Sequence, residues 1–326
     1  MAQKAANSGK NKGKSSTVNQ VKDQKNLPLW LALGCALLAF LLYANTLGFS
    51  YVLDDFSLIK ENLLTQKGFS GLPEIFKSSY RSGYYLPDND LYRPLSKAMF
   101  AIEWELAPNS PELSHWVNVF IYAIIGFLLY RFLFSITNCN IWLSLVIALL
   151  FIAHPLHTEV VSNIKSRDEL LSFLFFLLMS LTCLKYLSGE RWLYLVGAGL
   201  SFAFALLSKE SSIVFAFAVP LLLWFFTNAE WRKIGLLGGL FLMISLGFLF
   251  LRWKILGAAP GGIQASVMDN LLMATKDRGL QFTTAIALLG LYIKLFFIPQ
   301  PLVSDYSFNQ IALMGWGDWH FIFSGC

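Results

Sequence analysis

Long apolar runs separated by short polar connections dominate the chain. Most are close to the roughly 20 residues that an α-helix needs to cross the ~30 Å hydrocarbon core of a bilayer. The runs cover residues 28–47, 115–134, 140–153, 169–187, 192–207, 211–227, 233–251 and 282–299, and another begins near Trp316–Phe323. This pattern predicts an all-α, polytopic transmembrane helix bundle of about 8 spans plus the start of a ninth.

The first connection, residues 48–114, is large and polar and contains many aromatic residues. Within it, Ile59–Leu64, Leu72–Phe76 and Ser96–Leu106 have amphipathic spacing. Such segments are typical of short helices that lie along a membrane surface. We therefore expect an ordered outer loop with interfacial helices.

Composition and charge support this interpretation and orient the chain. Only 14% of the 326 residues are charged, against roughly 25% in soluble domains, and 56% are hydrophobic. The net charge of +5 comes entirely from residues 1–26, which hold six lysines and one aspartate. We expect a disordered cytoplasmic tail there, followed by one membrane domain over 27–326. A basic tail of this kind gives no reason to expect nucleic acid as a partner; the lipid bilayer is the expected one.

The positive-inside rule tests the orientation. With the N-terminus in the cytoplasm, the short inner connections carry Arg131, then Lys185 and Arg191, then Arg232 and Lys233. The chain is therefore predicted to be an integral, multi-pass membrane protein with its N-terminus in the cytoplasm. Its opposite face would be periplasmic in a bacterial inner membrane or lumenal in the endoplasmic reticulum.

Two adjacent carboxylates, Asp54 and Asp55, follow the first apolar run. Neighbouring acids repel each other, and near apolar surface the pKa of one of them can rise. Such a pair suits a proton acceptor or a cation site. The alternative is a pair of solvated loop acids.

Further polar residues fall on the same predicted side of the membrane as the acid pair. They are Arg93 in the first loop; His154, His157, Glu159, Lys165, Arg167, Asp168 and Glu169 after the third run; Lys209 and Glu210; and Arg252 with Lys254. Ionisable residues at membrane depth are costly, so they usually face one another or an aqueous cavity. Singly, each has another interpretation. The two histidines could be a metal pair, Lys209–Glu210 a helix cap or an interfacial snorkel, and Arg167–Asp168 a local ion pair at a helix start.

Together, carboxylates and cations on one face suit a phosphate-bearing substrate. ATP and nucleotide sugars are made on the other side, and the chain has no Gly-rich phosphate loop. A transferase with this face would take its donor group from a lipid phosphate. An Asp would act as base for the acceptor hydroxyl, and Arg, Lys or His would stabilise the leaving phosphate. No metal ligand set is predicted; a divalent cation stays possible, although an acid pair alone is a poor cage for one.

An ordered set of motifs resembles a known family. The set comprises Asn45-x-x-x-Phe49-x-Tyr51-x-x-Asp54-Asp55, Arg93-Pro94-Leu95, His115-x-x-Asn118, His154-Pro155-x-His157-x-Glu159, Arg167-Asp168-x-Leu170-Leu171, Leu207-x-Lys209-Glu210 and Asp305-Tyr306-Ser307. Together they resemble the transmembrane and tetratricopeptide-repeat-containing O-mannosyltransferases, members of the type-C glycosyltransferase fold. The resemblance runs over about residues 45 to 310.

The resemblance implies an inverting glycosyltransferase that uses a polyprenyl-phosphate sugar, dolichyl-phosphate mannose in eukaryotic members, and a protein or glycan acceptor. Asp54 or Asp55 would be the base, with Asp54 favoured. The donor-phosphate contacts would be Arg93, His154, His157, Lys165, Arg167 and Lys209. Supporting positions would be Glu159, Asp168, Glu210, His115, Asn118 and Asp305. The chain ends inside an expected helix without helical repeats, which predicts either a truncated or a reduced member.

Two functions from other classes compete with this one. A transporter or flippase of lipid-linked saccharides would need charges along a path through the bilayer, whereas here they gather at one face. A catalytically inactive scaffold would present its outer loop to partners.

Overall fold

The computed structural model describes residues 26–85, 91–189, 191–257, 271–303 and 311–318. Every regular element in these ranges is helical, which confirms the predicted all-α class. Five stretches are long and apolar enough to cross a membrane: Asn26–Gly48, Pro111–Ile136 (α4), Ile164–Gly189 (η4, Ile164–Ser166, and α7, Arg167–Gly189), Trp231–Leu256 (α10) and Arg278–Phe297 (α11). Three shorter apolar helices are Ile141–Ile152 (α5), Trp192–Ser208 (α8) and Glu210–Phe226 (η5, Glu210–Val214, and α9, Phe215–Phe226). These eight coincide in order with the eight complete apolar runs, and the number of spans stays a prediction.

Local sequence sets where several of these helices begin. The hydroxyl of Ser110 accepts a hydrogen bond from the Leu113 N–H at the start of α4, and Pro111 takes the first helical position, where no N–H is needed. The side chain of Asn140 caps α5 in the same way, and Asp277 caps α11. The first turn of α7 carries two acids, which suit the positive end of the helix dipole.

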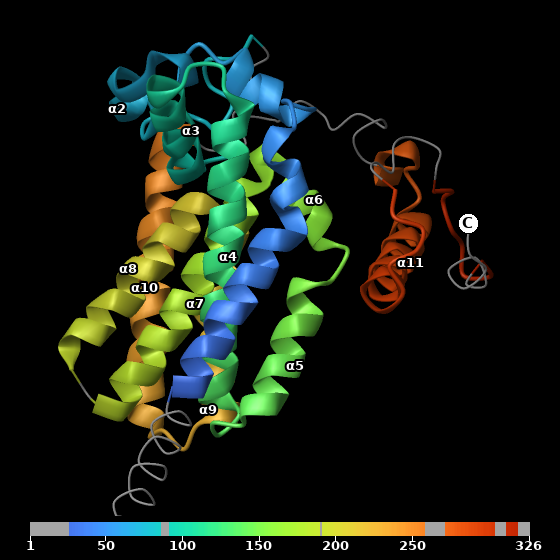
Figure 1. The fold of residues 1–326 in the computed structure, drawn as a ribbon. Coiled ribbons are helices and arrows are strands. Elements are labelled where there is room, and N and C mark those ends of the chain that lie inside the picture. The colour runs from blue at the N-terminus through green and yellow to red at the C-terminus, as the bar shows by residue number, and fades with distance from the viewer. Residues whose placement is uncertain (1–25, 86–90, 190, 258–270, 304–310, 319–326) are drawn as a thin grey trace, which may run out of the picture.

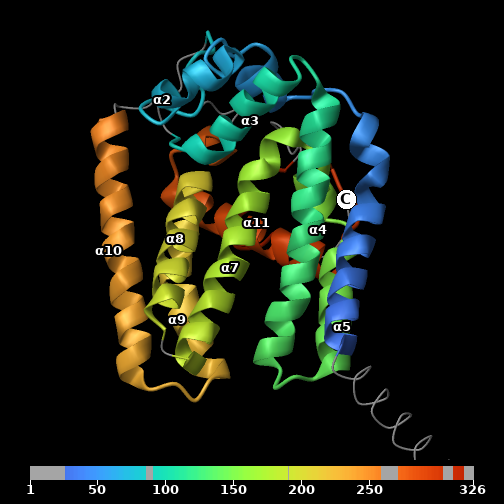
Figure 2. The ribbon, with the colours of Figure 1, turned by 60° about the vertical axis from the view of Figure 1, so that its left-hand side comes forward.

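The helices from the N-terminus to α10 stand side by side as a bundle with two distinct ends (Figures 1 and 2). One end carries the outer loop and the connection between α5 and α7. The opposite end carries the start of the first helix and the connections α4–α5, α7–α8 and α9–α10. α7 is the central element, because it packs against both α4 and α8. The two ends therefore divide the connections as the charge pattern predicts.

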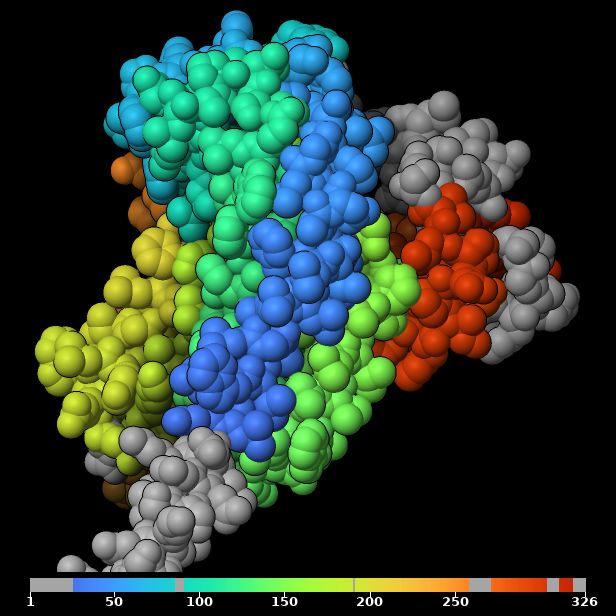
Figure 3. All heavy atoms as spheres, viewed as in Figure 1, coloured from blue at the N-terminus to red at the C-terminus, as the bar shows by residue number. Residues whose placement is uncertain are grey.

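Close packing of small residues holds the first helix against α4. A Cβ atom on Gly126 would lie 3.0 Å from the carbonyl oxygen of Cys35 and 3.2 Å from the Cβ of Ala39. Dense packing of this kind favours small residues at membrane helix contacts. Figure 3 shows the first helix, in blue, lying across the face of the bundle beside α5.

The outer loop folds into short helices over one end of the bundle. These are η2 (Phe56–Lys60), η3 (Thr65–Gly71), α2 (Leu72–Ile75) and α3 (Pro94–Leu106). The last two agree with the predicted segments. The helix expected over Ile59–Leu64 differs: the helical turn comes earlier and ends before Asn62. The buried Asn62 side chain accepts hydrogen bonds from the backbone of Leu64 and Thr65 and so replaces helical bonding.

Candidate active site

The acid pair lies at a strained point of the backbone. Leu53, directly before it, has a φ of 45°, which a residue with a branched side chain rarely adopts. A strained conformation costs about 1–3 kcal/mol and clusters at functional sites. The two carboxylates after it face different environments: the side chain of Asp54 is 41% exposed, whereas Asp55 is fully buried.

Asp55 ties the outer loop to the connection before α7. One carboxylate oxygen accepts a hydrogen bond from the Val52 N–H at 3.0 Å, and the other accepts one from the Lys165 N–H at 2.9 Å. Burial raises the pKa of Asp55 from 3.8 to about 6, against the opposing effect of these two hydrogen bonds. Both oxygens are thus engaged with the backbone, which makes Asp55 a structural anchor beside its neighbour.

Asp54 faces solvent between two cations. Its Oδ1 lies 3.1 Å from a guanidinium nitrogen of Arg81, and its Oδ2 lies 3.5 Å from the Lys165 ammonium. All three side chains are partly exposed. This arrangement leaves the Asp54 carboxylate open to an incoming group, with positive charge on both sides of it.

A second group of charges lies deeper at the same end. Arg93, just before α3, donates to the Asp168 carboxylate at 2.5 Å, and its guanidinium lies over the ring of Tyr80 at 5.6 Å. The same guanidinium lies 3.8 Å from a carboxylate oxygen of Glu210. Arg93 thereby joins the outer loop to α7 and to the α8–α9 junction.

Glu210 and Lys209 occupy the break between α8 and α9. Glu210 accepts hydrogen bonds from the Tyr92 N–H at 2.9 Å and from Arg252 at 3.0 Å. Lys209 pairs with Glu169 in the first turn of α7, and burial lowers its pKa. These long-range contacts exceed what a helix cap requires, so the junction is a meeting point of α3, α7 and α10.

Arg167 forms the buried centre of a third group. It is fully buried and binds the Glu103 carboxylate, the Asn118 side-chain oxygen at 2.8 Å and the Ser114 carbonyl at 2.9 Å. The guanidinium also lies 4.5 Å from the ring centre of Phe100. The donor-phosphate role expected for Arg167 stays a prediction, and its burial favours a positioning role.

The three predicted histidines lie in apolar surroundings near this end. His115 on α4 is buried beside the ring of Phe49. His154 shares a hydrogen bond with the Phe296 carbonyl at 2.8 Å, and His157 packs on the ring of Phe151. Burial lowers the pKa of His157 to about 4, so this imidazole is neutral at pH 7.

An apolar groove of about 380 Å³ opens beside the acid pair. Phe49, Val52 and Leu53 form one wall, Pro155 and Leu156 form another, and Glu159 also lines it. The groove therefore joins the strained segment that precedes Asp54 to the His154–Glu159 motif.

The structure adds residues that the motifs miss. Arg81 and Glu103 make two of the central ion pairs, and Lys97 is a fully buried lysine on α3 whose ammonium donates to the Ser82 carbonyl at 2.5 Å. The sequence signal for Glu103 and Lys97 is that both lie among apolar neighbours in a segment with amphipathic spacing. Asp305, by contrast, lies outside the described residues.

Within the described ranges, no three His, Cys, Asp or Glu side chains are grouped so as to hold a metal ion. These described residues therefore offer no ligand set for the divalent cation that the sequence left possible.

No protein-family model matches the chain, and no solved structure matches it. Curated proteins do match. The protein O-mannosyl-transferase tmtc2 of Xenopus laevis is 31% identical over 185 residues, 54% of this chain and 22% of the relative. TMTC3 of Mus musculus is 30% identical over 188 residues, covering 52% and 19%, and Tmtc1 of Drosophila melanogaster is 28% identical over 190 residues, covering 55% and 21%.

The matched regions span about a fifth of the length of these curated relatives. Identity near 30% over more than 180 residues, in several relatives that share one name, indicates common descent. The chain is a distant homologue of the TMTC protein O-mannosyl-transferases over about half of its own length.

Proposed function

We propose that this membrane protein is a glycosyltransferase that moves a sugar, mannose by homology, from a polyprenyl-phosphate donor to a hydroxyl of a protein or glycan. The reaction would take place on the non-cytoplasmic side. The observation that carries the proposal is the contrast within the acid pair: Asp54 is exposed between two cations, while Asp55 is buried and bonded to the backbone.

Asp54 is the proposed base. It is the carboxylate of the pair that an acceptor hydroxyl can reach, and a base must come within hydrogen-bond distance of the proton it takes. Asp55 is the proposed positioning residue, because its bonds to Val52 and Lys165 fix the backbone on both sides of the site.

The chemical step is an inverting substitution at the anomeric carbon. The acceptor oxygen attacks that carbon from the face opposite the phosphate while Asp54 takes the hydroxyl proton. The new carbon–oxygen bond forms as the bond to the donor phosphate oxygen breaks, and the electron pair leaves with the lipid phosphate. The reaction needs no oxidant or reductant.

Lys165 and Arg81 are the cations best placed to meet the leaving phosphate, because they already flank Asp54. Positive groups aimed at developing negative charge lower the barrier most when water is excluded. Arg93 and Lys209 are paired with carboxylates, so they would support Lys165 and Arg81 without contacting the phosphate first. The prenyl chain would lie in the apolar groove walled by Val52 and Leu53.

The test is sugar transfer in membranes supplied with labelled polyprenyl-phosphate mannose and an acceptor extract. Asp54→Asn should lower transfer by at least about 10²-fold, as expected for the loss of a general base, with unchanged protein level. Asp54→Glu, which keeps a carboxylate, should retain measurable transfer.

Glu61→Gln, a change of an acid in the same loop, serves as the matched control and should leave transfer unchanged. Full transfer by Asp54→Asn would overturn the assignment of the base. No transfer by the wild-type chain, with donor bound, would favour the inactive scaffold; movement of donor across sealed vesicles without transfer would favour the flippase.

A further inference from the structure

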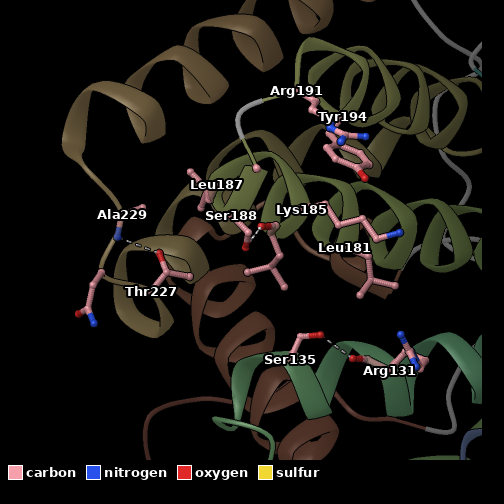
Figure 4. A pocket seen from close by; sticks show the side chains of 13 residues that line it. Arg131, Ser135, Leu181, Lys185, Leu187, Ser188, Arg191, Tyr194, Thr227 and Ala229 are labelled. Carbon is pink, nitrogen blue, oxygen red and sulfur yellow. Dashed lines mark hydrogen bonds between the residues drawn. The ribbon is translucent and has the colours of Figure 1, made fainter. Parts of the chain in front are cut away.

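A second cavity lies at the opposite end of the bundle from the acid pair. It measures about 770 Å³ and lies between α4, α7, the start of α8 and the segment after α9. Figure 4 shows its lining side chains, with Arg131 on α4, Lys185 on α7 and Arg191 before α8. The volume lies within the range of small-molecule sites.

The described lining of this cavity is cationic. Three positive side chains line it, and no lining residue in the described part of the chain is acidic. The Lys185 ammonium lies 5.8 Å from the ring centre of Tyr194. The neighbouring Glu190 lies outside the described residues. A concave site with three cations in its lining favours an anion with several acceptor oxygens.

Tryptophans mark this end as a membrane interface. Trp142, Trp192 and Trp231 lie in the first turns of α5, α8 and α10. Trp30, near the start of the first helix, and Trp224, near the end of α9, lie at this same end of the bundle. All five are exposed, from 47% to 69%. Exposed tryptophans at helix ends are typical of the headgroup level of a bilayer. The cavity therefore opens where lipid headgroups lie.

The same cavity also has an apolar side. Leu181, Leu184 and Leu187 of α7 line it. A ligand that combines a phosphate with acyl chains would satisfy both parts, since the phosphate would meet the cations and a chain would lie on the leucines. A soluble phosphate would use only the first part.

We propose that this cavity binds the headgroup of an anionic phospholipid of the leaflet opposite the acid pair. The positive-inside orientation makes this the cytoplasmic leaflet, where anionic lipids are enriched. The site is independent of Asp54 and of the transfer reaction. Bound lipid would bridge α4, α7 and α8 at the end where only short connections join them.

The experiment compares two lipids on the full chain. The protein is reconstituted in nanodiscs of equal parts phosphatidylglycerol and phosphatidylcholine with identical chains, released, and weighed by native mass spectrometry to count retained lipids. Affinity is then measured from the unfolding midpoint in detergent as short-chain phosphatidylglycerol is added. Parallel titrations use short-chain phosphatidylcholine and glycerol phosphate.

We expect the wild type to retain phosphatidylglycerol at least about tenfold over phosphatidylcholine. The double variant Arg131→Gln/Lys185→Gln should bind phosphatidylglycerol about 25-fold more weakly, at about fivefold for each cation near a membrane surface. The matched control Arg232→Gln/Lys233→Gln removes the same charge from the same end, outside the cavity, and should keep most of the affinity.

Equal retention of the two lipids by the wild type would overturn the proposal, and this measurement does not depend on any variant folding. An equal loss in the control double variant would also overturn it, because surface charge alone would then explain binding. Glycerol phosphate as effective as the lipid would reassign the cavity to a soluble phosphate.

Discussion

The buried pair of Arg167 and Glu103 supports the proposed site from beneath, and its removal should be costly. In Arg167→Met the apolar replacement fills part of the space but leaves the Glu103 carboxylate without its cation. Asn118 and the Ser114 carbonyl also lose a donor. The predicted defect is in folding stability first and in transfer only as a consequence.

The magnitude follows from burial. Arg167 is fully buried and the Glu103 side chain is 9% exposed, so solvent screens the pair very little. Breaking such a pair from one side costs about 3–5 kcal/mol, chiefly because a charge stays buried without a partner. The double variant Arg167→Met/Glu103→Met removes both charges, so we expect it to recover at least about half of that loss.

The assay is unfolding by sodium dodecyl sulfate in mixed micelles, followed by circular dichroism at fixed lipid content. Lys67→Met is the control, because Lys67 forms an exposed pair with Glu74 and exposed pairs contribute about 0–1 kcal/mol. An Arg167→Met protein as stable as the wild type would refute the reasoning. So would a double variant less stable than the single one.

Three further predictions use the same assay. The pKa of Asp55 is about 6 in the folded protein and 3.8 in the unfolded chain, so its protonation stabilises the fold below pH 4. This stabilisation, about 3 kcal/mol in all, is lost as the pH rises through 6. Asp55→Asn should remove this pH dependence. Lys97, with burial lowering its pKa from 10.5 to about 7, should make stability rise between pH 7 and 10, and Lys97→Met should flatten that rise. Glu210→Gln, which weakens a charge-assisted bond to Arg252, should cost about 2 kcal/mol, whereas the exposed Glu230→Gln should cost less than about 0.5 kcal/mol. A flat wild-type pH profile, or equal costs for the two glutamates, would contradict these predictions.

Part of the site could be predicted from the sequence alone because bilayers impose strict rules on hydrophobicity and charge. Apolar runs predicted the helices in order, and the basic connections indicated which ends share a face. The motifs drew attention to Asp54, Asp55 and Arg93. These inferences need only local composition, since a helix in lipid must satisfy its own backbone.

Tertiary structure decided the surroundings of each polar residue. Asp54 and Asp55 are chemically identical neighbours, and only the fold buries one and exposes the other. Arg81 could not be chosen from the sequence, since its contact with Asp54 joins residues 27 positions apart. Arg167 was predicted as a phosphate ligand by its motif, but its partners come from α3 and α4, which a one-dimensional pattern does not bring together. The physical reason is that residue type fixes which charges exist, whereas packing fixes how much water and which partner each one keeps.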